Sequence, residues 1–316
     1  MAKMSKNDFP FIEEYLITGL HYYQNYRFKF KHPTNVIVGE SGLGKTKILH
    51  LLYLSLTKRW IALSKHKFDF IYIKFGNGKS LRIAKGELEF YILSNNSDLL
   101  INDQRDKIHK KFYEIEATIN STILGHVIYF PVYRNVMDDL GMIGKNYAET
   151  RFPNDFNPAE LTEALDIEAK VLIPSTLDQL ISLNKQNKGD DNLIKLIQLC
   201  NSYLLGVKLY FSKTTVISIR NQITDEIVDL DQLSSGEKQL VYFFLKVYFS
   251  IAPCVYVLFD EPELSIPIEW QRKLLKDLTQ FNKISFLLAI THSPFIFDNE
   301  YDEFTSGINI YKFLPE

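Results

Sequence analysis

The fold of this chain is decided by one stretch of eight residues, Gly39-Glu40-Ser41-Gly42-Leu43-Gly44-Lys45-Thr46. The stretch matches the pattern G-x-x-x-x-G-K-[ST], and it lies between an apolar run at 35–38 and an amphipathic helical pattern. Glycines let backbone N–H groups approach phosphate oxygens, and the start of a helix adds the positive end of its dipole. The stretch therefore predicts an α/β fold with a phosphate-binding loop. Lys45 is expected to contact the β and γ phosphates of ATP, and Thr46 to hold Mg²⁺.

Two carboxylates, Asp260 and Glu261, follow a second apolar run at 255–259. Ligands of open α/β sheets collect at the carboxyl ends of the strands, so both side chains are expected at the nucleotide. Asp260 is suited to hold Mg²⁺ through water, and Glu261 to act as the general base on the attacking water. An isolated Asp-Glu pair is more often a helix cap, and the upstream phosphate loop is what favours the catalytic interpretation.

A third apolar run, at 284–290, ends in Thr291-His292-Ser293-Pro294. His292 is therefore expected at the same edge of the sheet, where it contacts the γ-phosphate or the attacking water. A single histidine at a strand end is more often a structural hydrogen-bonding group. Only its convergence with the other two strand ends favours the functional interpretation.

The segment 233–239 carries an S-x-x-E pattern, formed by Ser234 and Glu237. This capping box predicts a helix that begins with its backbone donors available to an anion. Such caps are common, and alone the pattern indicates no more than a helix start. Because the chain already has its own phosphate loop, we expect Ser234, Ser235, Gly236 and Glu237 to contact the nucleotide of another subunit.

Together these motifs resemble the ABC-type ATPase heads, with 233–239 as the signature, Asp260-Glu261 as Walker B, 263–266 as the D-loop and His292 as the switch histidine. The forms Asp-Glu-Pro-Glu-Leu-Ser and Thr-His-Ser-Pro are most similar to the RecF, SMC and OLD branch. The segment 129–134 also resembles one in ATPase subunits of bacterial anti-phage systems, such as the PtuA component of Septu. Two departures are Pro267, where OLD-like ATPases commonly have histidine, and the lack of a convincing Q-loop glutamine.

The resemblance implies an ATP-hydrolysing head (a P-loop fold of a mixed sheet, flanking helices and an antiparallel β layer). It further implies Mg²⁺, a homodimer or higher oligomer closed around ATP, and control of a separate effector protein, a nuclease or toxin, in anti-phage defence. The alternative is a DNA-repair or chromosome-associated ATPase that clamps nucleic acid directly. A transporter subunit is disfavoured by the form of the signature. The expected organisation is an N-terminal lobe at 1–134, a mostly helical insertion at 135–205 and a C-terminal lobe at 206–316.

Composition limits the classes of protein further. The formal charge of −2 lacks the basic excess of a chain whose whole surface binds nucleic acid. Cys200 and Cys254 have no paired spacing, which suits a reducing cytoplasm and argues against a cysteine-based zinc site. The apolar run at 240–259 is interrupted by Lys246 and Pro253. It is therefore interpreted as a helix, a turn and a buried strand rather than a membrane span.

The remaining segments have simpler patterns. Alternation predicts a hairpin at 15–30 and an antiparallel layer at 68–93, and helices are expected at 45–63 and 103–117. Tyr22, Tyr23 and Tyr26 could stack on adenine, although hairpin aromatics more often pack. Lys107 and the cluster His109-Lys110-Lys111 could meet a phosphate backbone, although such runs are usually solvated helix faces.

Overall fold

The structure is a computed structural model, and it describes residues 10–20, 24–39, 43–95, 103–123, 126–131, 191–211, 217–228, 232–248, 250, 252, 254–281, 283–308 and 310–311. The chain divides into two compact units. The first unit comprises Met1–Val132, Ala252–Pro262 and Asn282–Glu316, and the second comprises Tyr133–Ile251 and Glu263–Phe281. Each unit is therefore built from segments that are distant in the sequence.

A five-stranded parallel sheet forms the centre of the first unit. Its order is β12 (Thr305–Gly307), β3 (Thr34–Val38), β11 (Ile284–Thr291), β10 (Val255–Asp260) and β6 (His126–Phe130). Every residue of β10 and of β11 is buried. Parallel strands covered on both faces have continuous apolar runs, so the strands predicted at 35–38, 255–259 and 284–290 are confirmed.

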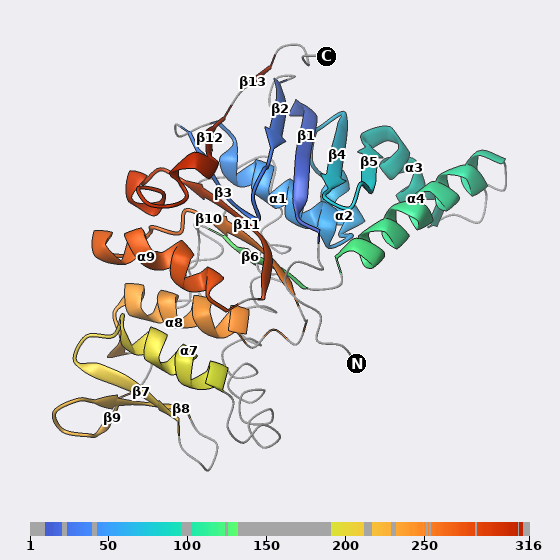
Figure 1. Cartoon of the computed structure of the whole chain (residues 1–316). Coiled ribbons are helices and arrows are strands. Elements are labelled where there is room, and N and C mark those ends of the chain that lie inside the picture. The colour runs from blue at the N-terminus through green and yellow to red at the C-terminus, as the bar shows by residue number, and fades with distance from the viewer. Residues whose placement is uncertain are drawn as a thin grey trace, which may run out of the picture. The chain divides into compact units, whose positions relative to one another are not determined.

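An antiparallel sheet forms the second layer of the first unit, in the order β13 (Ile310–Tyr311), β2 (Gln24–Lys29), β1 (Ile12–Leu20), β4 (Phe70–Phe75) and β5 (Ser80–Ala84). Helix α1 (Lys45–Leu56) lies between this sheet and the parallel one (Figure 1). Side chains from both sheets and from α1 share one apolar core. The predicted α/β class, with an antiparallel β layer on a P-loop head, is confirmed.

One buried hydrogen bond ties the antiparallel sheet to the phosphate-loop helix. The hydroxyl of Tyr15, on β1, donates to the backbone oxygen of Ile48 in α1 at 2.9 Å, and Tyr15 is fully buried. Tyr15→Phe is therefore expected to lower the free energy of unfolding by about 1 kcal/mol, the usual net value of one such bond. Urea denaturation measures this loss. Tyr72→Phe, on the neighbouring strand β4, is the matched control, and an equal loss in both variants would contradict the assignment.

Two predictions about this unit are wrong in part. The helix expected at 45–63 breaks after Leu56, because Lys58 takes a left-handed conformation (φ 58°) and the hydroxyl of Thr57 bonds the backbone oxygen of Tyr53. A separate short helix, α2, spans Trp60–Ser64. The antiparallel layer expected at 68–93 ends at Ala84, and α3 (Lys85–Asn95) follows. An ion pair between Lys85 and Glu89, at 3.2 Å, has the i,i+4 spacing of a helix.

The other elements of the first unit lie close to their expected positions. Helix α4 spans Asp103–Thr122, five residues beyond the predicted end at 117. Two short 3₁₀ helices, Pro294–Ile296 and Asp302–Phe304, follow β11.

Within the part of the chain that the structure describes, no helix is both long and apolar enough to cross a membrane. The apolar run at 240–259 is divided between a helix and β10, as predicted.

The second unit holds α7 (Asp191–Asn201), α8 (Ser235–Tyr248) and α9 (Ile268–Thr279) with a small antiparallel sheet, β7 (Val207–Phe211), β8 (Ile217–Asn221) and β9 (Ile227–Val228). Most of the predicted helical insertion lies outside the described residues, and α7 is the helix described in its range.

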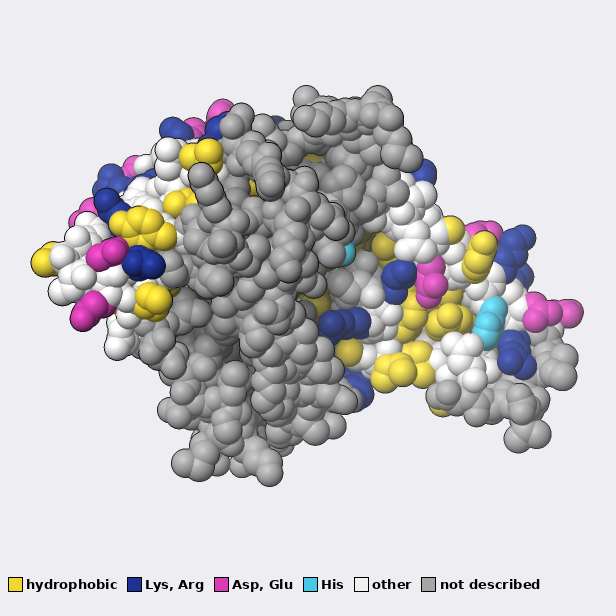
Figure 2. Space-filling view, turned by 90° about the horizontal axis from the view of Figure 1, so that it is seen from below, with side chains coloured by type: hydrophobic (Ala, Val, Ile, Leu, Met, Phe, Trp, Pro, Cys, Tyr) yellow, Lys and Arg dark blue, Asp and Glu magenta, His cyan; other side chains and the backbone are white. Residues whose placement is uncertain are grey.

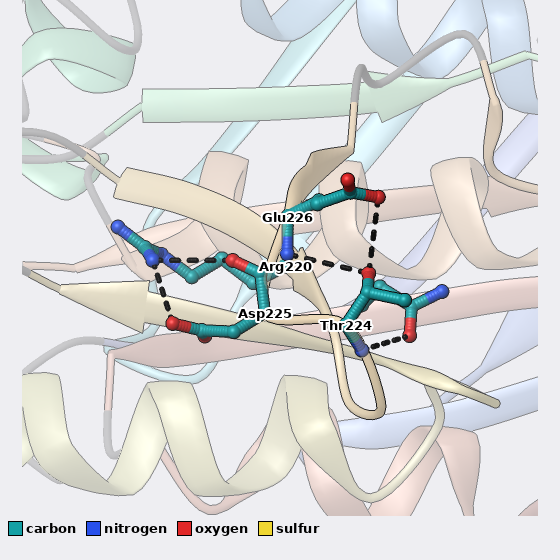
Figure 3. A network of polar contacts seen from close by, with 5 residues as sticks. Arg220, Thr224, Asp225 and Glu226 are labelled. Atoms are coloured by element: carbon teal, nitrogen blue, oxygen red, sulfur yellow. Dashed lines mark hydrogen bonds and ion pairs between the residues drawn. The ribbon is translucent and has the colours of Figure 1, made fainter.

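Side chains close the β8–β9 turn (Figure 3): Arg220 Nη1 lies 3.0 Å from Asp225 Oδ2, and Thr224 Oγ1 donates to Glu226 at 3.2 Å.

Candidate nucleotide-binding site

The phosphate loop connects β3 to α1 in the first unit. Gly44 caps the helix in a left-handed conformation (φ 73°), which glycine adopts without steric cost, and its carbonyl accepts from the N–H of Ile48 at 2.9 Å. The Lys45 ammonium donates to the carbonyl of Gly39 at 2.7 Å, so this side chain reaches back to the residue at the start of the loop. Lys45 is only 6% exposed. The Lys45 side chain is thus buried, with its ammonium bonded to the backbone of Gly39. Glu40, Ser41 and Gly42 lie outside the described residues.

The strand order brings the predicted catalytic residues to one edge of the parallel sheet. Strands β3, β11 and β10 are consecutive neighbours, so the phosphate loop, Thr291-His292 and Asp260-Glu261 leave adjacent strands at their carboxyl ends. In such sheets this edge is the usual ligand site. His292 therefore emerges between the loop and the two carboxylates.

The carboxylate pair differs in exposure and conformation. Asp260 is completely buried, whereas the Glu261 side chain is 23% exposed. Glu261 has a left-handed backbone (φ 45°), and its N–H donates to the carbonyl of Ile290 at 2.8 Å. Non-glycine residues seldom adopt this conformation, and those that do are frequent at functional sites. The backbone of Glu261 therefore leaves the extended conformation directly after β10.

His292 and Glu261 face each other across the two strand ends, with His292 Nε2 3.6 Å from Glu261 Oε1. That separation is longer than a direct hydrogen bond. The turn around His292 is fixed by its neighbours, since the N–H of Ser293 donates to the Thr291 hydroxyl at 2.9 Å and the N–H of Phe295 to the Ser293 hydroxyl at 3.3 Å. The imidazole and the carboxylate therefore lie close together at the ends of the two strands.

The donor set at this edge fits a magnesium nucleotide. Mg²⁺ prefers oxygen ligands, and the Thr46 hydroxyl and Asp260 carboxylate are of that kind. A Cβ atom at Gly39 would lie 3.2 Å from the Ile308 side chain, which is a tight contact. The packing at the start of the loop therefore favours glycine.

The capping box predicted at 234–237 is formed in the second unit. The N–H of Ser234 donates to Glu237 Oε2 at 3.0 Å, the Ser234 hydroxyl donates to the same oxygen at 2.6 Å, and the N–H of Glu237 lies 3.3 Å from that hydroxyl. The other carboxylate oxygen accepts from the N–H of Leu205 at 2.9 Å. Burial raises the pKa of Glu237, but these hydrogen bonds outweigh it and hold the pKa below its usual value. Glu237 therefore acts within its own subunit as a charged anchor for the helix start.

The turn at 263–266 lies directly against the start of α8. The carbonyl oxygen of Ser265 is 2.3 Å from the position that a Cβ atom on Gly236 would take, so only glycine fits at 236. The side-chain amide of Gln271 donates to the carbonyls of Ile266 at 2.8 Å and of Glu263 at 3.4 Å. Sequence reasoning missed Gln271 and Leu205, since neither belongs to a motif. A glutamine on the apolar side of an amphipathic helix was the available signal for Gln271.

The secondary candidates are mostly engaged within the protein. The ammonium of Lys111 bonds Glu87 at 2.5 Å, and the imidazole of His109 lies 2.8 Å from the Ser94 hydroxyl. Tyr26 is buried, and its hydroxyl donates to the side chain of Gln24 at 2.6 Å, as expected of a packing residue. Tyr22 and Tyr23 lie outside the described residues. On the face in Figure 2, the described Lys and Arg side chains lie among Asp and Glu side chains.

Comparisons with known proteins find only solved structures of low sequence identity to this chain. No family model matches it, and no curated protein matches it. Among solved structures, it is similar to an SMC head bound to the C-terminal winged-helix domain of ScpA, with 14% identity and a TM-score of 0.45 over 96% of this chain and 98% of the other. The Thermotoga maritima SMC head domain gives 12% identity and a TM-score of 0.40 over 91% of each chain. An Smc head with an extended coiled coil, bound to the C-terminal domain of ScpA, from Pyrococcus furiosus, gives 12% and 0.42 over 96% of each.

Proposed function

We propose that this chain is an ABC-type ATPase head, which binds and hydrolyses ATP and dimerises around it. The observation that carries the proposal is the convergence at one sheet edge. Three adjacent parallel strands end at this edge, and they are followed by the phosphate loop with Lys45, by His292 and by the pair Asp260-Glu261. These are the groups needed to bind a triphosphate, balance its charge and activate a water.

In the proposed reaction, each of these side chains has its own role. Glu261 accepts the proton of the water that attacks the γ-phosphorus, and the leaving ADP takes the P–O bond electrons. Lys45 contacts the β and γ phosphates, and His292 contacts the γ-phosphate or the same water. Thr46 and Asp260 would hold Mg²⁺, and the bound ion would supply positive charge to offset the negative charge of the transition state.

The second subunit supplies the start of α8. The N–H groups of Ser235 and Gly236 belong to the first helical turn and have no intrahelical acceptor by geometry. Glu237 caps its own helix, which leaves the dipole and these two donors to bind an anion. Since the chain has a phosphate loop of its own, the anion assigned to this helix start is the ATP held by a partner copy.

Ser235→Arg tests this assignment. The long cationic side chain at the exposed start of α8 should prevent close approach to the partner subunit while leaving the chain's own phosphate loop intact. We expect ATP affinity within about twofold of the parent and at least a roughly tenfold weaker ATP-dependent dimer. Fluorescent-nucleotide titration and sedimentation velocity measure the two quantities. Gln232→Arg, three residues upstream and also exposed, is the matched control. Equal loss of nucleotide affinity in Ser235→Arg and Lys45→Ala would refute the assignment.

Two downstream roles follow from the motif resemblances, and the proposed closure serves either. In the first, closure controls a separate effector, a nuclease or toxin of an anti-phage system, as the resemblance at 129–134 suggests. In the second, the closed heads clamp nucleic acid, as in DNA-repair or chromosome ATPases of the SMC-like branch. DNA that stimulates hydrolysis in a salt-sensitive manner would support the second role. Lack of stimulation, together with a stable protein partner in pull-downs, would support the first.

A further inference from the structure

The start of α8 and the turn at 263–266 are in direct contact within the second unit. Trp270 of α9 comes within 3.8 Å of the Cβ position of Gly236 in α8. The carbonyl of Ser265 occupies the space that any larger residue at 236 would need. The nucleotide-facing helix turn and the 263–266 turn are therefore packed without a gap.

The turn itself is held in an uncommon conformation. Ser265 has a φ of 61°, in the left-handed region that non-glycine residues rarely occupy. In this conformation, the carbonyl oxygen of Ser265 lies against Gly236. A strained residue keeps such a conformation only where the surrounding structure imposes it.

The Gln271 side chain bonds both ends of this turn. Its amide donates to the carbonyls of Ile266 and Glu263, at 2.8 and 3.4 Å, which are the last and first residues of the turn. The N–H of Ile266 closes the turn by donating to the carbonyl of Glu263 at 3.1 Å. Gln271 is only 8% exposed, so water competes little for these carbonyls. Gln271, in the first turn of α9, thus forms hydrogen bonds with both ends of the 263–266 turn.

We propose that Gln271 is a positioning residue for ATP-dependent closure. It fixes the 263–266 turn in the conformation that supports the start of α8, so both segments meet the partner subunit as one rigid surface. This inference rests on the proposed function, because it concerns the approach of that surface to the partner's ATP. Gln271 touches no nucleotide, so its role is expected in dimerisation and kcat rather than in the chain's own affinity for ATP.

The test uses the full chain in the Glu261→Gln background, where ATP is bound and turns over slowly. Gln271→Met keeps the length of the side chain and removes its donors. We expect at least a roughly tenfold weaker ATP-dependent dimer and an ATP affinity within about twofold of the parent. The thermal midpoint should fall modestly, because two buried hydrogen bonds are lost. Gln280→Met, at the C-cap of the same helix, is the matched control, since Gln280 bonds Asp277 rather than the turn.

A second variant keeps the inference testable if Gln271→Met folds poorly. Gly236→Ala adds a Cβ atom that must displace the Ser265 carbonyl, and it should weaken the dimer similarly. The double variant should be little worse than either single one, because both act on the same turn. Additive losses, or a Gln271→Met dimer as tight as the Gln280→Met dimer, would overturn the inference alone. A parent that does not dimerise with ATP would instead overturn the proposed function, and this inference with it.

Discussion

Glu261→Gln is expected to lower kcat for ATP hydrolysis by roughly 10²- to 10⁴-fold, the usual contribution of a positioned general base. Glutamine has nearly the same shape, but it cannot take a proton from the attacking water. The carboxylate is 23% exposed at the sheet edge, and its backbone already carries the left-handed strain (φ 45°), which glutamine tolerates no worse than glutamate. ATP affinity should change little, since the substitution leaves Lys45 and the phosphate loop unaltered.

Single-turnover hydrolysis of radiolabelled ATP separates the chemical step from binding. The control is Glu269→Gln, the same substitution at an exposed position in the first turn of α9. Its kcat should match that of the wild type. Hydrolysis by Glu261→Gln at the wild-type rate would remove Glu261 from the mechanism and leave the buried Asp260 as the remaining carboxylate at this edge.

Lys45→Ala is expected to weaken ATP binding by about 1.5–3 kcal/mol, or about ten- to more than a hundredfold, the range for hydrogen bonds to a charged group. The ammonium already lies over the phosphate loop, 2.7 Å from the Gly39 carbonyl, so little reorganisation is needed to contact phosphate. The loss should be larger for ATP than for ADP, because the γ-phosphate is one of the predicted partners.

Isothermal titration with ATP and with ADP measures this difference. Lys47→Ala, two residues along the same helix, controls for the general loss of positive charge. The thermal midpoint of both variants should remain close to that of the wild type. An unchanged ATP affinity in Lys45→Ala, or equal losses in Lys45→Ala and Lys47→Ala, would exclude the loop as the nucleotide site.

The parallel core was predictable because its strands are buried on both faces and therefore have unbroken apolar runs. The site's main residues follow those strands directly, so their shared edge was predictable as well. The helix break at Lys58 was not, because 45–63 contains no proline or glycine after Thr57 and the amphipathic pattern continues through it. Helix α3 was missed because alternation and helical periodicity are hard to distinguish in a short, half-buried segment.

The supporting contacts of the site were beyond sequence reasoning for a different reason. Gln271 acts through an amide that reaches back to the turn before its own helix, and Leu205 acts through a backbone N–H. Neither contact depends on a residue pattern. The positive φ of Glu261 and Ser265 also arises from tertiary packing, since glycine would be the local preference at both positions.

The central claim is that two copies close around ATP, and sedimentation velocity of Glu261→Gln with Mg²⁺ and either ATP, ADP or no nucleotide tests it most directly. The account predicts a dimer with ATP and monomers in the other two conditions, with the ATP-dependent dimer lost on adding Ser235→Arg. A sedimentation profile that is the same in all three conditions, whether monomer or dimer, would contradict it.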